Sequence, residues 1–318
     1  MDSLQYCLAV GTDVTIGVQA APSDALEWRA LARKVERVGL SSLLLADHPG
    51  SGAAPFVALG ASAAETQHIA LGSYVANAGV WDPLSLSSAV ATLDLISGGR
   101  ALLGVGAGHT PAEWTMRGLA YPTSGARVQR MIELVGVTQR LLQGETVTFD
   151  GEHITAVDAV LDEPRPVQPR IPLVVGGYGL RVLTYAAEHA DVVALSGLGR
   201  TLDDGHRHET LWDDTDIDHR VEAVTSAASA AGRAPQLEAL VQVVELTDDA
   251  EAAAARLAAK VPNLTADQVI SSPFAWVGTA EEIASQLRDR RRRWGIARHV
   301  IRSAAIDSAG RVLKALAS

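Results

Sequence analysis

A regular alternation of short apolar runs with amphipathic segments is the feature that most limits how this chain can fold. Eight runs have the length and composition of buried strands, and most are followed by a segment with helical spacing of apolar residues. The runs are VTIGVQA, LSSLLLADH, IALGSYVANAG, RALLGVGAG, PLVVGG, DVVALSG, LEALVQVVEL and RHVIRSA. Repeated strand–helix units predict an α/β fold with a parallel sheet. Eight such units favour a closed (β/α)8 TIM barrel over a doubly wound sheet, which is the second candidate.

Capping signals mark the ends of several predicted helices. Gly39 follows an amphipathic segment in a C-cap position, and Gly98 and Gly99 end another helical segment. Thr279 with Glu282 matches a capping box at the start of a third. These residues are therefore expected to mark the ends of the corresponding helices.

The length of 318 residues suits one large barrel. We therefore predict a single domain over residues 1–318, with insertion segments at the carboxyl-terminal face of the barrel at 146–170 and 198–216. The first insertion contains Asp150-Gly151, which predicts a hairpin with a type I′ turn. It then continues into the proline-rich stretch DEPRPVQPRIP, which suits either a linker or an extended excursion that re-enters the sheet.

The second insertion runs into a polar stretch, Asp203–His219, with three histidines and many acidic residues. Their spacing fits no standard ligand set, so no metal site is predicted. Two interpretations remain for this stretch, a solvated loop and a lid in which Trp212 covers the substrate.

Charge and cysteine content exclude several classes of protein. The net charge is −10, and such a surface repels phosphates, so nucleic-acid binding is not expected. The basic run RDRRRRWG is interpreted as a solvated helix face. A single cysteine, Cys7, excludes an internal disulfide framework and suits a reducing cytosol. No signal peptide and no membrane span are recognised, so we predict a cytoplasmic protein.

The segment Arg100–Trp114, RALLGVGAGHTPAEW, raises the question of a dinucleotide loop. Gly104, Gly106 and Gly108 resemble such a motif, but His109 stands where its third glycine should be. The run is also the fourth strand rather than the first, and no acidic residue lies at the required distance. Two interpretations remain: small residues let the barrel layers close tightly, or they leave room for a flat ring at the carboxyl end.

Polar or bare-backbone positions recur at consecutive strand ends, which is where the active sites of barrel enzymes lie. They are Asp47 and His48 after the second strand, Tyr74, Val75 and Asn77 at the end of the third, Gly176 and Gly177 after the fifth, and Ser196 after the sixth. We expect these residues to share one site.

Several motifs, in a common order across nearly the whole chain, resemble one known family. They are LLLADH, IALGSYVANAG, ATLDLISGGRALLGVGAG, GARVQRMIEL, PLVVGG, YAAEHADVVAL and FAWVGTAEEIASQLRDRRRRWGI. They resemble the bacterial luciferase-like superfamily of flavin- and deazaflavin-dependent (β/α)8 oxidoreductases, and more closely its coenzyme F420-dependent branch. The resemblance implies a homodimeric enzyme that moves a hydride between the deazaflavin and a small organic substrate. Reduction of an activated C=C or C=N bond is the preferred direction.

The resemblance also implies roles for individual residues. A non-prolyl cis peptide at Tyr74–Val75 is expected to support the cofactor ring, with Asn77 at the ring edge and His48 near the reactive carbon. The remaining expected cofactor contacts are Gly106, Ala107 and Gly108 on the wall, and Gly176, Gly177, Tyr178 and Ser196 on the phosphate side. Asp47 is expected either to orient His48 or to cap the next loop.

The chain departs from the family at two positions. Some relatives carry a glutamate acid after the fourth strand, where this chain has His109, so His48 and His109 are the two candidates for proton transfer. Sugar-phosphate-oxidising relatives hold phosphate with lysines, but Gly199 occupies such a position here, which argues against a sugar phosphate. Two other functions stay open, an FMN-dependent monooxygenase and a non-catalytic barrel that serves as a binding partner.

Overall fold

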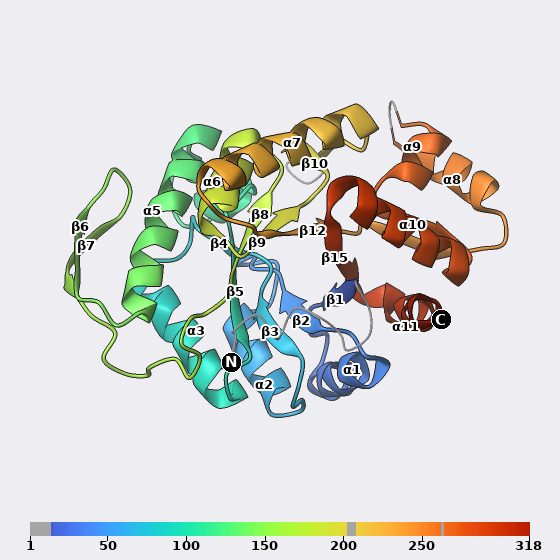
Figure 1. The fold of residues 1–318 in the computed structure, drawn as a ribbon. Coiled ribbons are helices and arrows are strands. Elements are labelled where there is room, and N and C mark those ends of the chain that lie inside the picture. The colour runs from blue at the N-terminus through green and yellow to red at the C-terminus, as the bar shows by residue number, and fades with distance from the viewer. Residues whose placement is uncertain (1–13, 202–207, 262–263) are drawn as a thin grey trace.

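Parallel strands arranged in a ring form the centre of the computed structural model (Figure 1), which describes residues 14–201, 208–261 and 264–318. Cys7 and part of the predicted second insertion lie outside these residues. Within them, eight parallel strands close on themselves, because β3 pairs with β5 as well as with β2. Around the ring they are β1 (Thr15–Gln19), β2 (Ser42–Leu45), β3 (Ala70–Ser73), β5 (Ala101–Gly106), β8 (Leu173–Gly177), β9 (Val192–Leu195), β12 (Gln236–Leu240) and β15 (Ile296–Arg302). The predicted TIM barrel is confirmed, and the doubly wound alternative is wrong.

Helices surround the ring and cover its outer face (Figure 1). They are α1 (Ala25–Val38), α2 (Pro55–Ala63), α3 (Pro83–Ser97), α4 (Pro111–Thr115), α5 (Ser124–Leu142), α6 (Leu180–His189), α7 (Asp214–Ala230), α8 (Ala250–Ala258), α9 (Ala266–Ser271), α10 (Ala280–Trp294) and α11 (Ile306–Ala317). Gly39 and Gly98 adopt left-handed φ angles of 88° and 69° at the ends of α1 and α3. Thr279 and Glu282 form the capping box of α10. The predicted caps are confirmed.

Strand side chains alternate between two apolar layers. Leu44, Leu102, Val174 and Val300 belong to a cluster inside the barrel, whereas their sequence neighbours pack under the helices. Burying one such side chain stabilises the fold by about 1.5–3 kcal/mol. Because both faces of each strand are buried, the strands read as continuous apolar runs in the sequence.

Two of the apolar runs predicted as single strands each form two strands in the structure. The run LEALVQVVEL, predicted as one strand, breaks after β12, and its second half forms β13 (Val243–Leu246). β13 leaves the ring and pairs in parallel with β14 (Ala275–Gly278), a strand that the sequence analysis did not predict. At this break, the backbone N–H groups of Gln242 and Val243 both donate to the backbone carbonyl of Phe274. A continuous apolar run therefore concealed a change of partner. The short β4 (Ala76–Asn77) follows β3 and pairs with β5.

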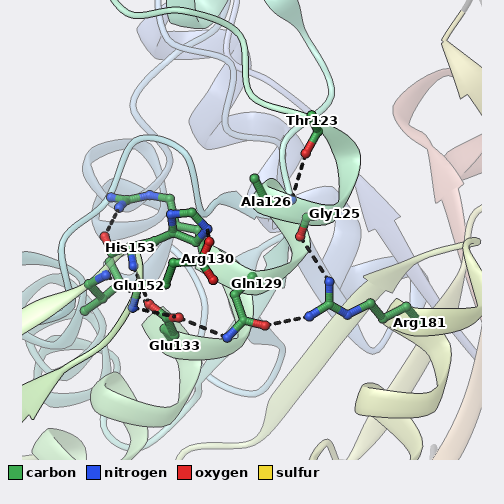
Figure 2. A network of polar contacts seen from close by, with 10 residues as sticks. Thr123, Gly125, Ala126, Gln129, Arg130, Glu133, Glu152, His153 and Arg181 are labelled. Carbon is green, nitrogen blue, oxygen red and sulfur yellow. Dashed lines mark hydrogen bonds and ion pairs between the residues drawn. The ribbon is translucent and has the colours of Figure 1, made fainter.

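The predicted hairpin exists, but its turn is not of type I′. β6 (Val147–Asp150) pairs antiparallel with β7 (Thr155–Ala159), and residues 151–154 connect them. The cause is Glu133 on α5, whose buried carboxylate accepts the backbone N–H groups of residues 152, 153 and 154 at 3.2, 2.8 and 3.0 Å (Figure 2). A tertiary contact thus overrides the local turn preference of Asp-Gly.

A second hairpin, β10 (Leu198–Thr201) with β11 (His208–Thr210), follows β9. Both hairpins fall in the segments predicted as insertions, and that assignment stays a prediction. In the described part of the chain, no helix is long and apolar enough to cross a membrane.

Candidate active site

His48 and Glu113 form a close ion pair at the carboxyl end of the barrel. His48 follows β2, and its Nδ1 lies 2.6 Å from Oε1 of Glu113 on α4. The Glu113 side chain is 2% exposed, whereas that of His48 is 39% exposed. The hydrogen bond to Glu113 raises the pKa of His48 above its ordinary 6.5, against the opposing effect of burial. His48 therefore keeps its proton to a higher pH than an ordinary histidine, while part of its side chain stays exposed to solvent.

Glu113 is a buried residue of this candidate site that sequence reasoning missed. Its second carboxylate oxygen accepts a hydrogen bond from Nδ2 of Asn77, so the carboxylate joins the ends of two strands. The available signal was its place: an acidic residue in the first turn of α4, four residues beyond His109. The structure thus places a carboxylate beside His48, although the position of the relatives' glutamate is occupied by His109.

Asp47 positions the backbone near His48 rather than the imidazole itself. Its buried Oδ2 accepts the backbone N–H of Asn77 at 3.0 Å and the indole N–H of Trp81 at 2.7 Å. Both bonds hold the segment from β4 to Trp81 rather than the loop directly after Asp47, so the two predicted roles stay predictions. Asn77 is itself engaged, because its Oδ1 accepts the backbone N–H of Gly79 at 2.8 Å.

The predicted non-prolyl cis peptide between Tyr74 and Val75 is confirmed. The neighbouring glycines provide space for this segment. A Cβ added to Gly106 would lie 2.5 Å from a Val75 methyl group, and one added to Gly176 would lie 2.9 Å from the other. A Cβ on Gly104 would lie 2.1 Å from the carbonyl oxygen of Ser73. The glycines of β5 therefore allow close packing of the barrel, the first of the two interpretations for this run.

Gly108 satisfies a separate backbone requirement. Its φ of +75° is a left-handed conformation, and a Cβ there would lie 2.2 Å from Oδ1 of Asn77. Its carbonyl accepts a hydrogen bond from Nε of Arg127 at 2.8 Å. The adjacent Ala107 is half-buried against the core. The segment 106–108, which was predicted as a wall of the cofactor site, is therefore held between Asn77 and Arg127.

His109 lies beside His48 but differs from it in charge. Its ring centroid is 5.5 Å from that of His48 and 4.8 Å from that of His208 on β11, both edge-to-face. Desolvation by the surrounding protein, then repulsion from His208 and His48, lowers the pKa of His109 to about 4. The residue is nonetheless exposed to solvent. A neutral His109 can hydrogen-bond a substrate, but it is a poor proton donor at cellular pH.

The end of β8 leads into a helix whose N-terminus has open amide groups. Gly179 is the N-cap of α6, and as a glycine it has no side chain that could accept the first N–H groups of the helix. A Cβ added to Gly179 would have no neighbouring atom within 4 Å, so the space beside it is open. Tyr178 turns its buried side chain away, because its hydroxyl donates to the carbonyl of Leu211 at 3.1 Å. Ser196, after β9, accepts the amide of Leu198 at 3.3 Å. An anion near Gly176 and Gly177 would therefore be held by backbone groups.

A network of polar side chains on α5 contacts both the segment after β4 and the start of α6 (Figure 2). Arg130 donates to the carbonyl groups of Ala78 and Trp81, at 2.9 and 3.0 Å, just beyond the cis peptide. Gln129 accepts from Arg181 in the first turn of α6. One helix thus fixes the loop after β4 and the start of α6. No group of three or more potential metal ligands occurs among the residues the structure describes.

The fold and site define a (β/α)8 barrel with an ion pair and an open helix N-terminus at the carboxyl ends of its strands. The family model that matches the chain is that of the luciferase-like monooxygenases, over residues 6–298, and the chain belongs to this family.

Individual relatives agree with this assignment. The F420-dependent glucose-6-phosphate dehydrogenase of Beutenbergia cavernae is 35% identical over 193 residues, covering 58% of this chain and 56% of that protein. The chain thus spans about half the length of the curated relatives it matches. A solved F420-dependent secondary alcohol dehydrogenase has a TM-score of 0.75 at 19% identity, covering 95% of this chain and 99% of that one. A monooxygenase from Streptomyces bottropensis has a TM-score of 0.72 at 21% identity, covering 96% and 98%. At these identities the two structures establish the fold alone.

Proposed function

We propose that the chain is a coenzyme F420-dependent oxidoreductase that reduces an activated C=C or C=N bond of a small organic substrate. The observation that carries the proposal is the His48–Glu113 pair, which lies at the carboxyl end of the barrel near the Tyr74–Val75 segment. The curated relatives support the choice of cofactor, since the names of the first six all contain F420.

The residues present suit a flat cofactor with a phosphate-bearing tail. Val75, with Gly106 and Gly176 against its methyl groups, would support one face of the ring. Asn77, Ala107 and Gly108 would lie along its edge, and Asp47 would keep this backbone in place. The open amide groups after Gly177 and Tyr178, with Ser196 nearby, would receive the phosphate. When bound, the deazaflavin supplies two-electron hydride chemistry, and the protein supplies position and electrostatics.

His48 is the proposed proton donor. Its protonated form is stabilised by the Glu113 carboxylate at Nδ1, which leaves Nε2 as the atom that can give a proton to substrate. His109, neutral at cellular pH, would contact the substrate by hydrogen bonding. The substrate is proposed not to be a sugar phosphate, because Gly199 stands where related enzymes of that type have a lysine.

The second candidate is an FMN-dependent monooxygenase, favoured by the description of the family and by the Streptomyces structure. Both cofactors fluoresce, so mixing the purified full-length protein with each one and measuring quenching separates the candidates. We expect quenching of F420. Tight FMN binding without F420 binding would refute the proposal.

A third possibility, a barrel without catalysis, is tested at His48. General acid catalysis contributes about 10²–10⁴-fold, so we expect His48→Ala to retain F420 binding and to lose turnover by a factor in that range. An unchanged rate would remove His48 from the mechanism. The proposed homodimer is tested by light scattering of the same purified protein, and the proposed cytoplasmic location by fractionation.

A further inference from the structure

Arg302 is a cation at the carboxyl end of the barrel that the proposed reaction leaves without a role. It is the last residue of β15, on which Arg298 and Val300 face the barrel interior. Because side chains alternate along a strand, Arg302 faces the same way, one layer higher. It stands in register with Gln19 of β1, and its side chain is exposed. The guanidinium therefore lies at the end of the barrel that carries His48.

The contacts of Arg302 leave most of its donors available. Its Nη2 donates to Oε1 of Gln242 at 3.0 Å, and Nε2 of Gln242 donates to the carbonyl of Ser196 at 3.1 Å. The second bond fixes the amide so that its oxygen faces Arg302. No ion pair with a carboxylate is formed by Arg302 within the described residues. Arg298, by contrast, is paired in the interior with Glu238 at 3.1 Å.

Arg302 also acts electrostatically on the proposed proton donor. Its positive charge lowers the pKa of His48, in opposition to Glu113 and Asp47. Burial by the surrounding barrel lowers the pKa of Arg302 itself, although the side chain keeps contact with solvent. Because the side chain is exposed, its unused N–H donors face solvent and are accessible to an anionic group of a substrate.

A second arginine near the histidines, Arg127, does not meet these conditions. Arg127 directs two nitrogens to the carbonyl groups of Gly108 and Pro122, and its plane stacks 4.3 Å from the ring centre of Tyr121. It therefore acts as a support for the backbone.

We propose that Arg302, held by Gln242, binds a carboxylate of the substrate and places it beside His48. A guanidinium offers a planar pair of N–H donors that matches a carboxylate in a bidentate manner. This inference rests on the proposed function. It narrows the substrate class from compounds with an activated double bond to small organic acids that contain one.

Binding of two matched probes to the F420-loaded full-length protein tests the inference. Benzoate and benzamide have the same shape but differ in charge, and isothermal titration measures both. We expect wild type to bind benzoate at least about tenfold more tightly than benzamide, as a charged hydrogen bond implies. Arg302→Gln should abolish the preference, and Arg302→Lys should keep part of it. Arg311→Gln, at an exposed position of α11, is the matched control and should behave as wild type.

The pKa of His48, followed by NMR in the protein without cofactor, provides a second measurement. We expect it to rise in Arg302→Gln, and to rise on addition of benzoate in wild type only. Equal affinity for the two probes in wild type would overturn the inference, and so would loss of F420 binding in both Arg302 variants, because Arg302 would then belong to the cofactor site. If F420 does not bind wild type, the proposed function fails instead. The NMR titration then decides the inference: a benzoate effect that depends on Arg302 supports it, and no effect refutes it.

Discussion

Replacing Gly104 by alanine tests whether the glycines of β5 serve close packing. The new Cβ would lie 2.1 Å from the carbonyl oxygen of Ser73, about 0.9 Å inside the 3.0 Å limit that real Cβ atoms respect. The opposing atom is backbone, so β3 or β5 must move. Overpacking of this kind costs about 1–3 kcal/mol, and we place this case at the upper end. The reduced freedom of the unfolded chain returns about 0.4–1 kcal/mol, so the net loss is about 2 kcal/mol.

The matched control is Gly136→Ala on α5, where an added Cβ has no other atom within 4 Å. This variant should gain about 0.5–1 kcal/mol, because alanine favours a helix over glycine. Urea unfolding followed by circular dichroism measures both. F420 binding should weaken in Gly104→Ala and remain unchanged in the control, since Ser73 precedes the cis peptide. Equal unfolding midpoints for Gly104→Ala and wild type would refute the packing argument.

Three further predictions concern titratable side chains. Glu113→Gln removes the main cause of the raised pKa of His48, so NMR should show a lower pKa for His48 in this variant. Because the His48 side chain is 39% exposed, the variant should lose only about 1 kcal/mol of stability. That stabilisation is present in wild type below pH 6.5 and disappears as pH rises through the raised pKa, so a stability difference that persists at pH 9 would contradict it. His109, with a pKa of about 4, should show no NMR titration between pH 6 and 8, and a transition there would refute its neutral state. Glu133→Gln weakens charged hydrogen bonds to the turn, so the amides of residues 152–154 should exchange faster with deuterium, with a loss of about 2 kcal/mol; unchanged exchange would show that the carboxylate does not hold the turn.

The barrel itself was predictable because its strands are buried on both faces and each is bounded by turn signals. The same property hid the break after β12, since an apolar run looks alike whether it stays in the ring or pairs with β14. The type I′ turn predicted from Asp150-Gly151 was also wrong, because the Glu133 carboxylate on α5 binds the backbone of a longer loop. Periodicity identifies elements, but it does not identify their partners.

The candidate site was predictable to the extent that strand ends converge. His48, the cis peptide and the glycines follow from position along strands and from the family resemblance. Glu113 does not, because its partner His48 lies 65 residues away and its burial depends on the folded barrel. Arg302 was likewise unremarked, since one arginine at the end of a strand carries no signal until its neutral neighbour Gln242 is known.

The attachment of the β6–β7 hairpin to α5 affects how this barrel can be altered. Inserting a residue between positions 151 and 154 would separate the turn from Glu133 and leave a buried carboxylate without its backbone donors. Arg130, which also donates to His153 at 2.7 Å, would transmit the disturbance to the carbonyl of Ala78 beside the active site. The length of this peripheral turn is thus constrained by contacts that also hold the backbone at the candidate site.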